Sequence, residues 1–384
     1  DYECFLKLLS LLREDLEYHQ VESFPVIDEI RLYALLSWLA TCEYSSFLEG
    51  CGIVDKMSFQ KVMMSTLDAI LECEAPQLQI ELPCTDDECL AAARGFQSIS
   101  DDNPIDTCVC AIDGFFLQFG GGVKVKPSEK HNFYSTDYYD YGMNIQAACD
   151  HHLRFVFLGV AGPASLYDDE ALHECSLGQQ IETLPGNFCA IGDCAYIPSE
   201  HVIPLFSHEQ SKIPENKNFN YFADQYRIHI ERAFCWMLFR WRVLREPFPL
   251  HCPPERVWKL VECVGRLHNF CLNDRISKNL PTMAEDASVY WNSSQYKMRA
   301  EIAESRFTEN HSDEILQKSS NRDRLVALIA SKGLVAPEEN ICEDCAGALM
   351  QNSTSEKSPA REASSDLEES SDERSTLLEP FLIE

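Results

Sequence analysis

Two short apolar stretches of the sequence each lead straight into an aspartate. Residues 108–112 read Cys-Val-Cys-Ala-Ile and precede Asp113-Gly114, and residues 188–192 read Phe-Cys-Ala-Ile-Gly and precede Asp193. A continuous apolar run of this length is typical of a strand that is buried on both faces. If the two strands are parallel neighbours, Asp113 and Asp193 lie side by side where the strands end.

The segments around these runs predict the rest of a mixed sheet. Met143 to Cys149 and Leu153 to Val160 are extended candidates separated by Asp150-His-His152, a pattern that favours a hairpin. Downstream, apolar residues recur every three or four positions, as expected for a helix that packs on the sheet. These residues are Tyr226, Ile230, Ala233, Phe234, Met237 and Trp241. Strands followed by helices indicate an α/β fold with a mixed sheet.

Glu231 follows Ile230 at the edge of the apolar stripe, so it can join Asp113 and Asp193. Three close carboxylates repel one another and raise their pKa values unless cations neutralise them. Mg²⁺ binds through a few carboxylates plus phosphate oxygens, and two such ions suit in-line attack on a phosphodiester. The trio therefore predicts a two-ion site for phosphodiester chemistry.

Each acid also has a simpler interpretation. Asp113-Gly114 can be a strand-ending turn, Asp193 can cap a helix, and Glu231 can pair with Arg227 four residues before it. For a single residue each of these roles is commoner than catalysis. The functional interpretation depends on the ordered combination.

That combination resembles the DDE superfamily endonuclease domain of Harbinger-type transposases over about residues 104–273. The matching stretches are Cys110 to Gly114, Tyr141 to Asp150 with Leu153 to Phe155, Gly162 to Ser165 with Asp168, Ala190 to Tyr196, Phe219-Asn220 with Arg227 and Glu231 to Phe234, Arg240 to Arg242, and Leu267 to Asn269. Tyr167 and Cys235 depart from the family pattern, which often has His and Gly at these positions.

The resemblance implies an RNase H-like mixed sheet flanked by helices, and cleavage and joining of DNA strands. It implies Asp113, Asp193 and Glu231 as catalytic residues and as ligands of two Mg²⁺ or Mn²⁺ ions. Asp168 is not among the three ligands that the family resemblance implies. The expected organisation is a helical, helix-turn-helix-like module at 1–95, the endonuclease domain at 100–275, and a partly helical, then disordered, acidic Ser-rich tail at 276–384.

The prediction of a helical module at 1–95 depends on the periodicity of apolar residues. Apolar residues near Ile27 to Leu39 and near Phe59 to Leu71 follow a 3.6-residue period on either side of Glu49-Gly-Cys-Gly-Ile53. Such a pair resembles a helix-turn-helix, but few basic residues are present for phosphate contacts. A helical packing module is favoured over a DNA reader.

The net charge of -30, from 62 acidic and 32 basic residues, means that any nucleic-acid surface must be local. The best candidate phosphate track lies on and after the glutamate helix and comprises Arg227, Arg232, Arg240, Arg242 and Arg245. A solvated helix face is an equal alternative. A smaller basic patch at Lys124, Lys126 and Lys130 beside Gly120 to Gly122 does not fit a phosphate-binding loop.

Several other features favour structural roles. The 18 cysteines are scattered through apolar runs and are expected to be reduced, and Cys342 to Cys345 is a weak zinc signal. His151 and His152 fit a hairpin tip better than a metal site, and His268 fits a structural hydrogen bond. Trp236 and Trp241 fit core packing better than base stacking.

No membrane span or secretory signal is evident, so a soluble intracellular protein, possibly a fragment, is expected.

Two functions stay open. One is a metal-dependent nuclease or transposase acting on DNA in the nucleus, a location inferred from the substrate, with the cytoplasm as the alternative. The other is a host-adopted, catalytically silent descendant that associates with DNA or protein, with a separate DNA-targeting partner. An Asp-dependent phosphatase is remote, because Asp113-Gly-Phe115 lacks the second acid.

Overall fold

The computed structural model describes part of the chain. The described residues are 1–19, 26–42, 56–100, 102–119, 128, 130–136, 138–245, 254–280 and 319–337. Residues 1–335 form one compact unit, and 336–384 form a second unit that lies almost wholly outside the described residues. The predictions for Glu49 to Ile53, the Gly120 to Lys126 patch, Cys342 to Cys345 and the acidic tail also lie outside them. The domain boundaries remain a prediction.

The N-terminal helices pack around a leucine-rich core. They are α1 (Tyr2–Leu11), α2 (Arg13–Tyr18), α3 (Asp28–Thr41) and α5 (Lys56–Glu72), and α6 (Asp86–Gln97) follows. The two predicted helices are thus confirmed as α3 and α5, and they contact each other. Arg31 is buried on α3 and donates to the Leu16 and His19 carbonyl oxygens at 2.6 and 2.8 Å, which satisfies the end of α2.

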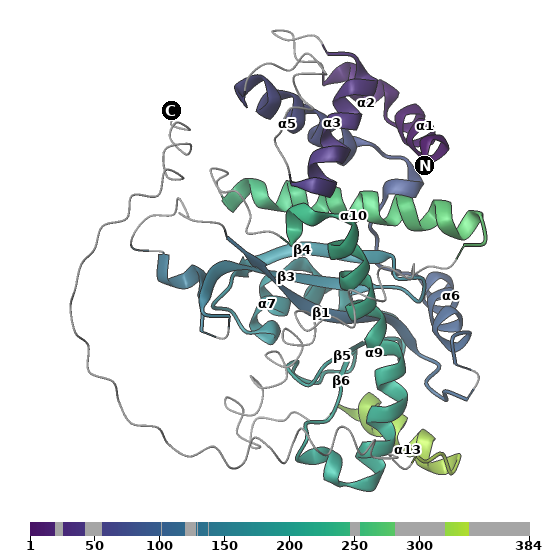
Figure 1. Cartoon of the computed structure of the whole chain (residues 1–384). Coiled ribbons are helices and arrows are strands. Elements are labelled where there is room, and N and C mark those ends of the chain that lie inside the picture. The colour runs from purple at the N-terminus through teal and green to yellow at the C-terminus, as the bar shows by residue number, and fades with distance from the viewer. Residues whose placement is uncertain are drawn as a thin grey trace, which may run out of the picture. The chain divides into compact units, whose positions relative to one another are not determined.

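The sheet has the predicted mixed, RNase H-like arrangement (Figure 1). Its strands are β1 (Cys108–Gln118), β2 (Tyr134–Ser135), β3 (Asp140–Cys149), β4 (Phe155–Pro163), β5 (Cys189–Gly192) and β6 (Val202–Pro204). The central order is β4-β3-β1-β5-β6, with short β2 also pairing with β3. β3 is antiparallel to β1 and β4, whereas β1, β5 and β6 are mutually parallel.

The strand containing Asp113 is longer than predicted. β1 continues to Gln118, because Gly114 to Gln118 pair with Gln146 to Gly142 of β3. The alternative of a strand-ending turn at Asp113-Gly114 is therefore wrong. β5 does end at Gly192, directly before Asp193. The β3–β4 hairpin is confirmed, with β4 starting at Phe155 instead of Leu153.

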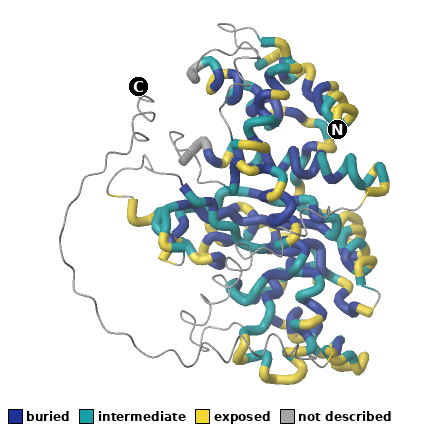
Figure 2. The backbone as a smooth tube through the Cα atoms, in the orientation of Figure 1, coloured by how far each residue is buried: buried dark blue, intermediate teal, exposed yellow. Residues whose placement is uncertain are grey.

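Helices cover both faces of the sheet. α9 (Pro214–Arg240) contacts β1, β3 and β5, and α10 (Pro254–Ser277) contacts β4. On the other face α7 (Asp168–Glu174) and α8 (Ser176–Glu182) form a second core with β1 and β5. Strands β3, β5 and β6 are buried along most of their length and β1 along its first half, whereas β4 is mainly half-buried (Figure 2). The predicted apolar stripe on α9 is confirmed, with Trp241 directly after the helix end.

The remaining elements are short or peripheral. α13 (Ser320–Ser331) packs on α9. The 3-10 helices are η1 (Pro76–Leu78), η2 (Lys130–Phe133), η3 (Gln210–Lys212) and η4 (Arg242–Leu244). None of the helices in the described part of the chain is long and apolar enough to cross a bilayer.

The cysteines and tryptophans that were predicted to be core residues lie in the core or at its edge. All described cysteines are free thiols, and Cys108, Cys110, Cys189 and Cys263 are buried, while Cys271 is partly buried. Trp236 and Trp241 are 2% and 5% exposed. Their indoles therefore pack in the core and are not base-stacking surfaces in this structure.

The Leu267-His-Asn269 segment of α10 forms hydrogen bonds with the start of β4 and the residues just before it. His268 Nε2 lies 2.9 Å from the Leu153 carbonyl oxygen and donates to it, as predicted. The Asn269 side chain accepts from Phe155 N at 2.8 Å and donates to Phe155 O at 2.7 Å. Burial lowers the pKa of His268 to about 3, so its ring stays neutral.

We expect Asn269→Ala to lower the free energy of unfolding by about 2 kcal/mol or more, because it leaves the buried Phe155 backbone groups without partners. Urea unfolding followed by circular dichroism measures the change. Gln179→Ala, on the exposed face of α8, is the control and should shift the midpoint little. Equal midpoints for the two variants would contradict the assigned role of Asn269.

Candidate active site

Asp113 and Asp193 come together through strand pairing. Ala111 of β1 pairs with Ile191 of the parallel strand β5. Asp113 and Asp193, two residues further along each segment, therefore lie next to each other. The Asp113 carboxylate accepts a hydrogen bond from Gly114 N at 2.8 Å through Oδ1. Asp193 Oδ1 likewise accepts from Ala195 N at 2.9 Å. Backbone N–H groups thus fix one oxygen of each acid.

Glu231 reaches the same region from α9. It is half-buried beside the buried Ile230, and α9 packs on β1 and β5. Arg227 Nη1 forms an ion pair with Glu231 Oε1, and Arg227 Nε binds Asp224 Oδ1 at 2.6 Å. The i,i+4 pair considered from the sequence therefore exists. It is not a surface pair, since its side chains are only 16% and 15% exposed.

The pKa values place the three acids in one electrostatic cluster. Burial raises the pKa of Asp113 well above its usual value, and the charges of Asp193, Asp168 and Glu231 raise it further. Burial and the neighbouring Asp168 raise the pKa of Asp193 to about 6, while the Ala195 N–H and Arg227 oppose the shift. Asp113, Asp193 and Glu231 therefore lie near enough to influence one another's charge, and their role as a set of catalytic ligands stays a prediction.

Asp168 is a fourth acid of this cluster, and it was not among the predicted ligands. It is 8% exposed at the start of α7, and its Oδ1 accepts from Asn144 Nδ2 at 3.1 Å and Gln146 Nε2 at 3.2 Å. Asn144 and Gln146 alternate on β3 and so point to the same face. Two amides at i and i+2 in an otherwise apolar strand were the sequence signal for a buried polar partner.

The arginines of the predicted phosphate track lie in different environments. Arg227 is held by Asp224 and Glu231, and the Arg240 guanidinium lies 5.0 Å from the centre of the Trp236 ring. Arg232 and Arg242 are exposed, and Arg245 is half-buried. The track as a DNA surface stays a prediction.

The histidine pair at the hairpin tip packs against α6. A Cβ on Gly95 would lie 2.2 Å from the His151 ring, so glycine there permits the close contact. Burial lowers the pKa of His151 to about 4 and also lowers that of His152. These contacts favour the structural interpretation of the pair.

The donor chemistry of the cluster fits a hard divalent cation. Asp113, Asp168, Asp193 and Glu231 supply only carboxylate oxygens, and Arg227 is the cation that lowers the pKa values of both Asp113 and Asp193. In the described residues, no three His, Cys, Asp or Glu side chains form a group close enough to hold a metal ion. The carboxylate oxygens would have to move closer together to bind an ion.

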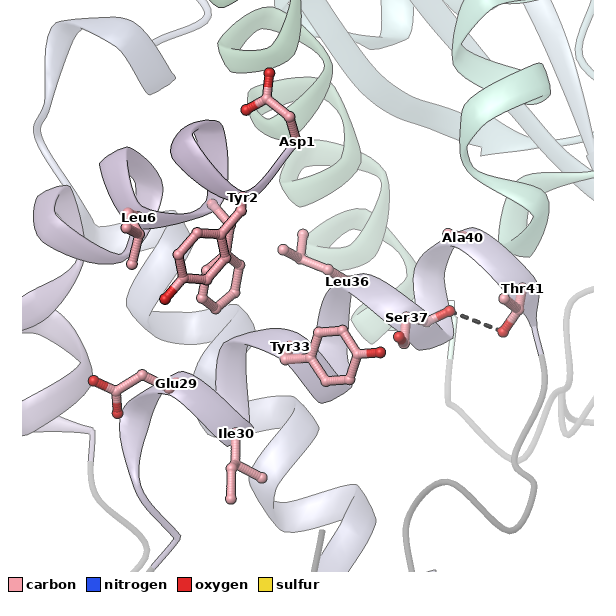
Figure 3. A pocket seen from close by; sticks show the side chains of 11 residues that line it. Asp1, Tyr2, Leu6, Glu29, Ile30, Tyr33, Leu36, Ser37, Ala40 and Thr41 are labelled. Carbon is pink, nitrogen blue, oxygen red and sulfur yellow. Dashed lines mark hydrogen bonds between the residues drawn. The ribbon is translucent and has the colours of Figure 1, made fainter. Parts of the chain in front are cut away.

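A pocket of about 700 Å³ lies elsewhere, between α1 and α3 (Figure 3). Its walls are mainly apolar and include Phe5, Ile30 and Leu36, with Tyr2 and Tyr33 along its sides. None of the clustered carboxylates lines it.

Fold and site together define an RNase H-like domain with an acidic centre. Residues 113–269 match the model of a family described as the DDE superfamily endonuclease. The match covers less than half of the chain and runs from the first acid of the cluster to Asn269. Neither the curated proteins nor the solved structures contain a match.

We expect Asp193→Asn to stabilise the metal-free protein increasingly as the pH rises. A carboxyl whose pKa is raised by folding favours the folded state below its unfolded pKa of about 4, and this contribution is lost as the pH rises through about 6. Asparagine does not ionise and can still accept from Ala195 N. Melting temperatures in EDTA from pH 4 to 8 should show a growing excess of the variant over wild type.

Glu174→Gln is the matched control, since Glu174 is exposed on α7. Its melting temperature should follow that of wild type across the range. A constant difference between Asp193→Asn and wild type would show that Asp193 is not in a repulsive environment.

Proposed function

We propose that this protein is a metal-dependent DNA endonuclease of the transposase type, with Asp113, Asp193 and Glu231 as ligands of two Mg²⁺ or Mn²⁺ ions. The observation that carries the proposal is the parallel pairing of β1 with β5, which sets Asp113 beside Asp193 within a segment that matches an endonuclease family. The Harbinger type and a nuclear location belong to the same proposal.

The chain's own residues would divide the work. The carboxylates would hold the ions, which when bound supply Lewis-acid chemistry for in-line displacement at a phosphodiester. Arg227 would orient Glu231 through their ion pair. The exposed Arg232 and Arg242, with Arg240 and Arg245, would bind DNA phosphates without reading sequence.

A second candidate function is favoured by one feature of the site. Arg227 already neutralises Glu231, as expected for an acidic centre that no longer needs a cation. In this case the protein is a catalytically silent descendant that associates with DNA through a separate targeting partner. The net charge of -30 also supports a partner that supplies the basic surface.

We expect the wild-type chain to cleave duplex DNA in Mg²⁺ or Mn²⁺, and Asp193→Asn to reduce the rate by more than about 100-fold. The reason is that changes outside the first ligand shell already cost 10–100-fold in metal sites. Cleavage of a labelled duplex, with and without EDTA, measures the rate.

Asp102→Asn, on a residue exposed before β1, is the charge-matched control and should cleave like wild type. Equal rates for wild type and Asp193→Asn would refute the endonuclease proposal. Absence of cleavage by wild type in either metal would favour the silent descendant.

A further inference from the structure

Two cysteines that are far apart in the sequence lie together where α1 meets α10. The thiols of Cys4 on α1 and Cys271 on α10 hydrogen-bond to each other. Both residues are only partly buried, and both pack against the edge of the larger core. The two sulfurs are therefore in contact, and neither residue is sealed inside the core.

Ion pairs on both sides of Cys4 hold α1 against α10. Lys7 Nζ lies 3.1 Å from Asp274 Oδ1. Asp1 Oδ2 lies 2.9 Å from Lys278 Nζ. Asp1 and Lys7 each lie three residues from Cys4 on the helix, so these bonds fix the face of α1 that carries the thiol. The contact between the sulfurs thus follows from the way the two helices dock.

The two thiols differ in acidity. The hydrogen bond from Cys4, together with the Arg240 guanidinium at the end of α9, lowers the pKa of Cys271 to about 6, although burial opposes this shift. The same hydrogen bond, together with burial, raises the pKa of Cys4. At neutral pH, Cys271 is therefore mainly a thiolate, which is the nucleophilic form, and Cys4 is a protonated thiol beside it.

Other cysteines of the described residues have the opposite character. Burial raises the pKa values of several core cysteines, which are Cys108, Cys110, Cys189 and Cys263. The exposed Cys84 lies beside Glu88, whose charge raises the pKa of that thiol. A lowered thiol pKa and a second thiol in contact coincide at Cys271.

We propose that Cys4 and Cys271 form an oxidation site, which hydrogen peroxide converts to a disulfide between α1 and α10. The Cys271 thiolate attacks one peroxide oxygen, the O–O bond breaks, and hydroxide leaves and takes a proton from solvent, which gives a sulfenic acid on Cys271. The Cys4 sulfur then attacks the Cys271 sulfur, the S–O bond breaks, and the departing oxygen takes the Cys4 proton and leaves as water. The two cysteines lose two electrons, and the peroxide gains them.

The test treats the full chain at pH 7 with a small molar excess of hydrogen peroxide, blocks the remaining thiols with iodoacetamide and digests the protein with trypsin. Cleavage after Lys7, Arg266 and Arg275 places Cys4 and Cys271 on separate peptides that contain no other cysteine. We expect mass spectrometry to find these two peptides linked, and dithiothreitol to separate them.

Serine variants test the two roles separately. Cys4→Ser removes the thiol that closes the disulfide, so the link should be lost and dimedone should label Cys271 as a sulfenic acid. Cys271→Ser removes the thiolate, so the link should be lost and Cys4 should stay unlabelled. Cys84→Ser removes an exposed thiol elsewhere and is the matched control, which should form the link like wild type. Alanine replaces serine in any variant whose circular dichroism spectrum differs from that of wild type.

Three results would overturn the proposal. They are wild-type protein without the Cys4–Cys271 link after peroxide treatment, a link that joins either cysteine to a different partner instead, and Cys4→Ser without a dimedone label on Cys271. The experiment uses neither metal nor DNA, so its outcome is independent of the proposed function.

Discussion

The acidic centre depends on the parallel pairing of β1 with β5. This pairing brings two aspartates level in a half-buried position, where their negative charges oppose each other. Apolar packing on both faces of the sheet must offset that repulsion, and the two hydrophobic cores on either side of β1 supply it. The site is therefore an unfavourable arrangement of charges that the rest of the fold keeps in place.

The surrounding acids divide according to the face of the sheet on which they lie. Glu231 comes from α9, on the side of the larger core, and carries its own counter-ion in Arg227. Asp168 comes from α7, on the opposite side, and is held by the neutral amides of Asn144 and Gln146. A guanidinium neutralises an acid, whereas an amide fixes its position and leaves its charge. The two helices therefore place acids of different electrostatic character on opposite faces of the sheet.

Much of the fold could be predicted from the sequence, because strands buried on both faces and helical apolar stripes leave local signals. The hairpin and the apolar stripe of α9 were predicted in this way, whereas the joint role of Asp113, Asp193 and Glu231 was inferred from their ordered combination and stays a prediction. The length of β1 could not be predicted, since Gly114 and Gln118 read locally as a turn and a polar position and become strand only by pairing with β3. The amides of Asn144 and Gln146 signal a buried polar partner, but the sequence does not identify Asp168 as that partner, because it lies more than twenty residues later on another element.

Gly114 has a consequence for comparing sequences of this kind. The space that its missing side chain leaves is filled by the carboxyl group of Asp168, so the two positions are sterically coupled. A related chain with any larger residue at the corresponding position must have moved or lost that acid. The identity of one small residue in a strand thus reports, without any assay, whether the fourth carboxylate is in place.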